Sequence, residues 1–327
     1  MKFTGHVPLL ECSNTAKEIY TFIQEYLNSS KRDGVVVGLS GGVDSALCAH
    51  LCVECLGKDK VLGLLLPERE SDPKSSEYAK AEAKKLGIRT EIVDITPALE
   101  SLESYKLRDT AIREIFPEYD GSQKSKMVLP ADLLSRDSLN FYTLIIQDKN
   151  GNSRSARLNN LTLRKIIAAN NLKQRARMLY LYRFAEMSNY MVCGTTNRSE
   201  YIQGFFVRYG DGGVDLEPIA DLYKTQVYQL ANFVGVSQEI ISRPPTPDTF
   251  SLAVTDEEFY FRIPYNKLDS FLYAWENKIS VPVVADAMKL DQDQVQRVFR
   301  DLGSKFNATK HLRILPPTPG LKITEKE

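Results

Sequence analysis

Residues 34–45 read GVVVGLSGGVDS, and this stretch decides the fold. Its β-branched run predicts a buried strand, and the apolar residues 46–52 that follow the Ser-Gly-Gly-Val-Asp-Ser turn predict a helix. Two adjacent glycines allow a backbone to approach a phosphate closely, and the amides at a helix start attract anions. The stretch therefore predicts a strand, a phosphate-binding loop and a helix in succession.

The same alternation continues along the chain. Strands are predicted at 34–39, 61–67, 89–95 and 190–195, and helices at 14–27, 75–87, 172–189, 223–234, 266–276 and 280–302. Mostly apolar strands separated by helices favour a parallel sheet that is covered on both faces. We therefore expect an α/β fold, Rossmann-like with an open parallel sheet, whose ligands bind at the carboxyl ends of the strands.

Residues 97–171 interrupt this alternation. Within them, 141–147 and 153–158 flank an Asn150-Gly151 turn, which predicts a β-hairpin. We expect residues 118–160 to be an insertion on the rim of the sheet, in a chain that otherwise forms one domain over 1–327.

Composition excludes several classes of protein. The 327 residues carry 42 Lys+Arg and 42 Asp+Glu, and the mean hydropathy is −0.28. No stretch has the ~20 apolar residues of a membrane span, and no secretory leader pattern is present, so we expect a cytoplasmic protein with no membrane or nucleic-acid partner. The net charge of zero conceals a local excess of positive charge, because residues 121–180 carry eleven bases and three acids. Such a region would favour binding of a small polyanion.

Cys48, Cys52 and Cys55 form a C-x3-C-x2-C string with His50 between them. In a loop such a string could hold an iron–sulfur cluster. In a helix the same spacing places all three thiols on one stripe that packs against the sheet, and we favour this second interpretation.

Asp44 lies inside the phosphate loop. A carboxylate there would repel a phosphate unless a cation bridges the two, so Asp44 indicates Mg²⁺. The alternative is a plain Gly-Gly turn with Asp44 and Ser45 as helix caps. The complete SGGVDS string differs from both the GxxxxGK[ST] and the GxGxxG loops.

This loop resembles that of the N-type ATP pyrophosphatases. Five further blocks, GTTNRSE (194–200), GFFVRYGDGGVD (204–215), EPIADLYKT (217–225), PPT (244–246) and TDEE (255–258), together resemble ammonia-dependent NAD⁺ synthetases. The resemblance covers residues 14–100 and about 171–320. It implies that ATP adenylates the carboxylate of nicotinic acid adenine dinucleotide and that ammonia then displaces AMP.

The resemblance also implies roles for individual residues. It assigns the ATP site to Gly38, Leu39, Ser40, Gly41, Gly42, Val43, Asp44, Ser45, Thr195, Lys224 and Thr246. Asp44 and Glu200 would hold Mg²⁺, with Asp44 and Lys224 as catalytic groups, although Glu200 also fits a capping box with Asn197. It assigns the dinucleotide site to Arg175, Arg208, Asp215 and His311.

Several points depart from the family or have simpler explanations. Arg208 stands where the family often has lysine, and Leu312 replaces the lysine of a His-Lys pair. Without the family context, Lys224 would be a solvated lysine on a helix face, and we interpret Lys173 and Arg177 as surface charges.

Other functions and partners stay open at this point. A tRNA-modifying pyrophosphatase is one alternative, and a relative that senses a dinucleotide or amidates another carboxylate is a second. The length leaves no room for an amidase domain, so we expect free ammonia or a separate glutaminase as the nitrogen source. The resemblance implies a homodimer.

Overall fold

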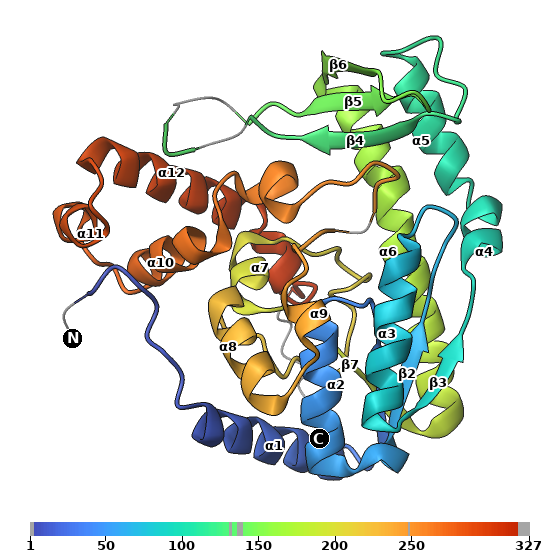
Figure 1. Cartoon of the computed structure of the whole chain (residues 1–327), viewed down its shortest axis with the longest axis vertical. Coiled ribbons are helices and arrows are strands. Elements are labelled where there is room, and N and C mark those ends of the chain that lie inside the picture. Colours follow the sequence, from blue (N-terminus) through green and yellow to red (C-terminus); the bar gives the residue numbers. More distant parts are fainter. Residues whose placement is uncertain (1–2, 131–132, 136–139, 248, 320–327) are drawn as a thin grey trace, which may run out of the picture.

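The computed structural model describes residues 3–130, 133–135, 140–247 and 249–319. Its first sheet is parallel in the order β3-β2-β1-β7, and its second is antiparallel in the order β4-β5-β6 (Figure 1). The strands are β1 (Gly34–Gly38), β2 (Val61–Leu65), β3 (Arg89–Ile92), β4 (Lys124–Val128), β5 (Thr143–Gln147), β6 (Ser153–Arg157) and β7 (Tyr190–Cys193).

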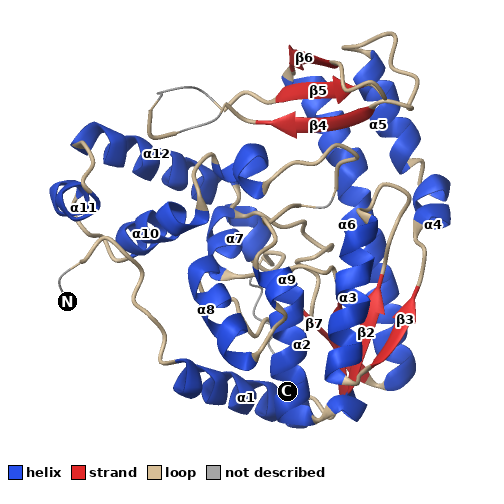
Figure 2. Ribbon diagram, in the orientation of Figure 1, coloured by secondary structure: helices blue, strands red, loops and turns tan. Residues whose placement is uncertain are grey.

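Helices make up most of the rest of the described chain (Figure 2). They are α1 (Cys12–Ser29), α2 (Val43–Leu56), α3 (Pro73–Leu86), α4 (Thr96–Ser101), α5 (Ser104–Arg113), α6 (Asn160–Ser188), α7 (Arg198–Gln203), α8 (Lys224–Val234), α9 (Gln238–Ile241), α10 (Tyr265–Glu276), α11 (Val281–Met288) and α12 (Gln292–Ala308).

Helices cover both faces of the parallel sheet, as the sequence predicts. Side chains of successive strand residues point to opposite faces. Val35 and Val37 accordingly join a core with α1, α2, α3 and α8, whereas Val36 joins a second core with α4, α5 and α6. All four strands run in one direction, so their carboxyl ends meet at one edge, where the loop after β1 lies.

The predicted hairpin is present but belongs to a larger element. β5 and β6 pair around the Asn150-Gly151 turn, and β4, which the sequence analysis missed, adds a third strand. Met127, Leu144 and Ile146 from this sheet pack on Ile112 of α5 and Ile166 of α6.

Two predicted helix boundaries were wrong. The helix expected at 172–189 starts at Asn160, because the Asn159 side chain accepts a hydrogen bond from the Thr162 amide and caps it. With 29 residues, α6 spans about 44 Å and reaches both sheets. The helix expected at 280–302 is two helices, since Lys289 adopts a left-handed conformation and Asp291 caps α12.

Candidate active site

The loop between β1 and α2 is closed by its own serines. Ser40 Oγ lies 3.0 Å from Ser45 Oγ and accepts a hydrogen bond from the Gly42 amide at 3.2 Å. Gly41 has a φ of +77°, and a Cβ added there would lie 2.3 Å from the Ser75 carbonyl oxygen. Glycine is therefore required at 41 for the loop to pack against the start of α3.

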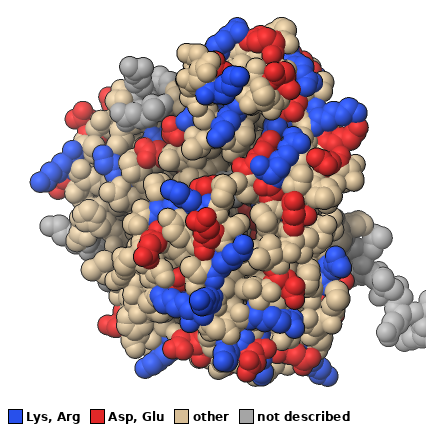
Figure 3. All heavy atoms as spheres, turned by 45° about the vertical axis from the view of Figure 1, so that its right-hand side comes forward, with Lys and Arg blue, Asp and Glu red and all other residues tan. Residues whose placement is uncertain are grey.

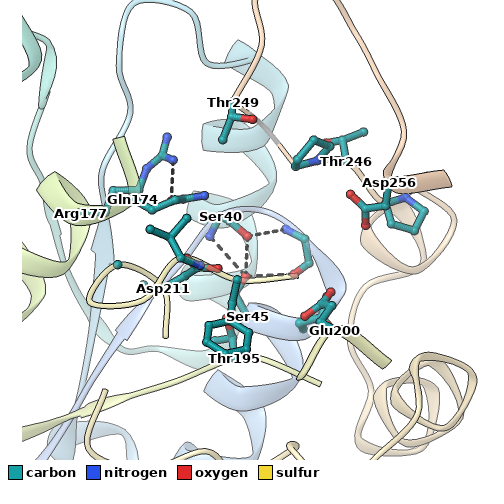
Figure 4. A pocket seen from close by; sticks show the side chains of 18 of the residues that line it. Ser40, Ser45, Gln174, Arg177, Thr195, Glu200, Asp211, Thr246, Thr249 and Asp256 are labelled. Carbon is teal, nitrogen blue, oxygen red and sulfur yellow. Dashed lines mark hydrogen bonds between the residues drawn. The ribbon is translucent and has the colours of Figure 1, made fainter. Parts of the chain in front are cut away.

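A pocket of about 480 Å³ opens beside this loop, at the carboxyl ends of β1 and β2. This volume lies in the usual range for small-molecule sites. Of the residues predicted to bind ATP, the lining includes Gly38, Leu39, Ser40, Gly42, Val43, Asp44, Ser45, Thr195, Lys224 and Thr246, and Glu200 also lines it. Gly41 faces α3 instead. Figure 4 shows Ser40 and Ser45 between Arg177 and Asp211 on one side and Glu200 and Asp256 on the other.

Lys224 is the centre of an acidic cluster in this pocket. Its ammonium donates a very short hydrogen bond to Asp44 and lies 3.4 Å from Glu200 Oε1. The lysine side chain is 2% exposed, so it is not the solvated lysine that its sequence position alone suggests. Asp44 is also held by the Asn197 side-chain amide at 3.0 Å.

The acids of the cluster outnumber its cation. Asp256 is buried and accepts a hydrogen bond from the Tyr265 hydroxyl at 2.9 Å, while its Oδ1 atom has no hydrogen-bond partner among the described residues. Burial raises the pKa of Asp256 to about 6. Burial also raises the pKa of Glu200, and the nearby Asp44 charge adds to the effect of burial while Lys224 opposes it.

The donors of the cluster fit Mg²⁺. Magnesium is commonly held by one or two carboxylates together with the phosphates of a substrate. Among the described residues no group of three or more His, Cys, Asp and Glu side chains forms a metal site by itself. Asp44 and Glu200 both pair with Lys224, and Asn197 donates a hydrogen bond to each of them. These two carboxylates would need phosphate oxygens to complete the coordination of Mg²⁺.

Many pocket residues had not been predicted from the sequence as site residues, and three charged examples are Arg243, Asp211 and Asp256. Arg243 donates to Asp72 Oδ2 at 2.9 Å and to Ser75 Oγ at 2.8 Å, which places its guanidinium beside the phosphate loop. Asp211 lines the pocket, and its carboxylate accepts a hydrogen bond from the Val207 amide at 2.8 Å. Asp256 lies in the TDEE block used for the family resemblance. Arg243 directly precedes Pro244-Pro245-Thr246, in which Thr246 was predicted to bind ATP, so its neighbours pointed to the site although the arginine itself was not predicted.

The residues predicted to bind the dinucleotide are placed differently. None of these four residues is among the described residues that line the pocket; they are Arg175, Arg208, Asp215 and His311. The Asp215 carboxylate accepts hydrogen bonds from the Tyr182 hydroxyl and the Val192 amide. The Arg208 guanidinium donates to the carbonyl oxygens of His311 and Ile314, so it holds the C-terminal segment.

Of the basic side chains in the stretch 121–180, Arg177 alone is among the described residues that line the pocket. The prediction that Lys173 and Arg177 are surface charges was wrong, because Lys173 is fully buried in an ion network and Arg177 lines the pocket. Elsewhere in the stretch, Arg154 pairs with Glu118 and Lys165 pairs with Glu114. On the face shown in Figure 3, basic and acidic side chains are interspersed rather than separated.

The cysteines lie where the helical interpretation puts them. Cys48 and Cys52 are fully buried in α2 against the sheet, and Cys55 is half-buried on the same helix. Cys52 Sγ lies 3.9 Å from Cys193 Sγ, and all five cysteines are free thiols. Within the described residues no helix is long and apolar enough to cross a bilayer.

A glycine-rich phosphate loop at the carboxyl edge of a parallel sheet, with carboxylates and a buried lysine beside it, defines a nucleotide-binding α/β protein. A more particular assignment follows from sequence comparison. The family model described as NAD synthase matches residues 15–121 and 138–316, and the chain belongs to this family. The unmatched interval, 122–137, contains β4.

Individual relatives agree with this assignment. The chain is 44% identical to the NH(3)-dependent NAD(+) synthetase of Mesorhizobium japonicum over 90% of this chain and 92% of that protein. Its fold is similar to those of NMN synthetase from Francisella tularensis (TM-score 0.66, 95% of this chain and 100% of that chain) and NH3-dependent NAD synthetase from Campylobacter jejuni (TM-score 0.62, 94% and 99%). Both structures are 22% identical in sequence, so these likenesses concern the fold.

Proposed function

We propose that this protein is an ammonia-dependent NAD⁺ synthetase, which uses ATP to amidate nicotinic acid adenine dinucleotide. The observation that carries the proposal is the convergence of the phosphate loop with Asp44, Glu200 and Lys224 on one pocket, in a chain of the NAD synthase family. The 44% identity to a named NH(3)-dependent NAD(+) synthetase supports the same reaction.

In the first step, a nicotinate carboxylate oxygen attacks the α-phosphorus of ATP, and the bond from that phosphorus to the bridging oxygen breaks. Pyrophosphate leaves with the bonding electrons, so negative charge builds up beside the loop. The loop amides, the Ser40 and Ser45 hydroxyls and the Lys224 ammonium are positioned to donate to it. Mg²⁺, held by Asp44 and Glu200, would neutralise phosphate charge when bound.

In the second step, ammonia attacks the carbonyl carbon of the acyl adenylate. The bond from that carbon to the AMP oxygen breaks, AMP leaves, and the nitrogen loses a proton to give the amide. Water would hydrolyse the same intermediate, so this step needs a site that excludes it. Phe250, Phe259 and Tyr260 supply aromatic lining to the pocket.

The test is a turnover assay with ATP, Mg²⁺, ammonium and nicotinic acid adenine dinucleotide. We expect NAD⁺, AMP and pyrophosphate in equal amounts. Absence of AMP release from a folded, ATP-binding sample would refute the proposal. Replacing the dinucleotide with nicotinic acid mononucleotide tests the alternative carboxylate, labelled tRNA tests the RNA-modifying alternative, and glutamine in place of ammonium tests the nitrogen donor.

We further propose that the protein acts as a homodimer. Arg175, Arg208, Asp215 and His311 lie outside the lining of the pocket in one chain, so a dinucleotide that reaches them would extend beyond this pocket. Family resemblance supports contact with the dinucleotide near a dimer interface. Light scattering on the purified protein tests the oligomeric state, and a monomer that turns over at full rate would refute this proposal.

A further inference from the structure

The described residues of the segment 244–262, which leave out residue 248 and are called here the cover segment, form one wall of the pocket. They contribute nine of the residues that line it, namely Pro244, Pro245, Thr246, Pro247, Thr249, Phe250, Asp256, Phe259 and Tyr260. Only Glu257–Phe261 of it has helical structure among its described residues. What holds such a segment in place therefore decides the shape of the site.

The antiparallel sheet β4-β5-β6 is called here the inserted sheet. The cover segment runs along its strand β4 (Figure 1). The Leu252 amide donates to the Ser125 carbonyl oxygen at 3.1 Å, and the Ser125 amide donates to Ser251 Oγ at 2.9 Å. Farther along, the Leu129 amide donates to the Glu258 carbonyl oxygen at 2.8 Å. β4 pairs with β5 on its other side, so the cover segment occupies what would otherwise be an open sheet edge.

A buried arginine fixes the end of the cover segment. Arg262 is 2% exposed, and its guanidinium donates to the Pro130 carbonyl oxygen at 2.8 Å and to Asn140 Oδ1 at 2.6 Å. These two acceptors lie on the chain that leaves β4 and returns toward β5. Displacing this buried guanidinium would break these hydrogen bonds where water does not reach the donors, which costs free energy.

An aromatic contact joins the same two elements. The Phe259 ring lies 5.7 Å from the Tyr142 ring, which immediately precedes β5, and 5.1 Å from the Phe250 ring. Aromatic pairs at such separations add to the free energy of apolar burial. Lys126 of β4 also pairs with Glu258 of the cover segment at 3.2 Å. The inserted sheet and the cover segment thus share backbone, ionic and apolar contacts.

We propose that the inserted sheet is a positioning element, which holds the cover segment over the pocket through β4 and Arg262. It thereby sets Thr246 and Asp256 opposite Asp44 and Lys224 before ATP arrives. β4 lies in the interval that the family model leaves unmatched, whereas β5 and β6 lie within the matched range. The ATP dependence described below rests on the proposed function, whereas the order of the cover segment does not.

Hydrogen exchange on the full chain without ligands tests the positioning directly. Ser251→Ala removes the acceptor for the Ser125 amide, and Arg262→Lys removes the forked geometry of the guanidinium. We expect amides of 244–262 to exchange about tenfold faster in Arg262→Lys and less so in Ser251→Ala, because local opening becomes easier. Matched controls on the outer strand β6, Ser153→Ala and Arg154→Lys, should leave these amides unchanged.

Kinetics provide the second readout. A cover segment that is closed less often lowers the fraction of protein competent to bind, so KM for ATP should rise about threefold to tenfold in Arg262→Lys, with kcat within about twofold. Unchanged exchange in both cover variants, or equal acceleration in the β6 controls, would overturn the proposal. If no NAD⁺ forms but exchange responds as expected, the proposed function fails and the positioning stands.

Discussion

Two buried lysines, Lys173 and Lys224, each face a pair of carboxylates, and they differ in how completely those acids are satisfied. The Lys173 ammonium donates to Glu68 and Glu70, each at 2.8 Å, and to the Thr249 carbonyl oxygen at 3.0 Å, which uses all three of its protons. The Lys224 ammonium pairs with Asp44 and Glu200. Asp256 lies nearby, and its Oδ1 atom has no hydrogen-bond partner among the described residues.

The pKa values of the acids express this difference. Burial alone would raise the pKa of Glu70, but the hydrogen bond from Arg108 and the charge of Lys173 outweigh it and lower the pKa to about 2. At the other lysine, burial raises the pKa of Glu200 to about 8. The cluster at Lys173, called here the saturated cluster, stabilises the fold. The cluster at Lys224, called here the unsaturated cluster, has carboxylate oxygens left that could accept a metal ion. Removing members of the two clusters should therefore have opposite consequences.

The largest expected effect is on turnover, at the unsaturated cluster. Asp44→Asn removes a proposed Mg²⁺ ligand but keeps the shape and the hydrogen bond from Asn197. We expect AMP release to fall by about a hundredfold to a thousandfold, as for loss of one preorganised electrostatic group. The unfolding temperature should not fall, because the acids there exceed the available cation. Near-normal AMP release would remove Asp44 from the site.

The next effect is on stability, at the saturated cluster. Lys173→Met leaves Glu68 buried without its cation and leaves Glu70 with Arg108 alone, which should lower the free energy of unfolding by about 3 to 5 kcal/mol. Urea unfolding measures this. Lys173→Arg, which keeps the charge, should lose less. A Lys173→Met variant as stable as the parent would show that the two clusters do not differ in kind.

These clusters also mark the limit of what sequence could predict. The loop at 38–45 and the order of β1, α2 and β2 depend on residues adjacent in the chain, so local pattern sufficed. Lys173 lies in the sequence KQRAR, which favours an exposed helix face, and its partners Glu68 and Glu70 are about a hundred residues earlier. β4 was missed because its outer edge pairs with residues 251–258, a contact that no local periodicity encodes.

Opposite pKa shifts predict opposite pH windows for the two clusters. The folded pKa of Glu200, about 8, exceeds its ordinary 4.5, so the folded protein binds more protons between these values and stability falls as pH rises through 8. Glu70, with a folded pKa of about 2, loses its contribution only as pH falls from 4.5 toward 2. We expect the metal-free protein to melt a few degrees lower at pH 8.5 than at pH 6.

Two variants test whether Glu200 causes this dependence of the unfolding temperature on pH. Glu200→Gln cannot ionise, so it should reduce the change in unfolding temperature between pH 6 and 8.5. Part of the change should remain, because burial also raises the pKa of Glu217 to about 8. Glu70→Gln should lower the unfolding temperature at both values without altering the slope. If Glu200→Gln retains the full slope, another group titrates there.

The smallest effect is expected at a third lysine that also faces an acid, but in solvent. Lys165 lies 2.5 Å from Glu114, closer than Lys173 lies to either of its acids, and the two side chains are 44% and 36% exposed. Water and salt screen such a pair, and ordering two long side chains opposes it. Lys165→Met should therefore shift the unfolding temperature by no more than about 1 °C. A shift as large as that of Lys173→Met would mean that separation, rather than burial, governs these pairs, and the contrast between Lys173 and Lys224 would then need a different cause.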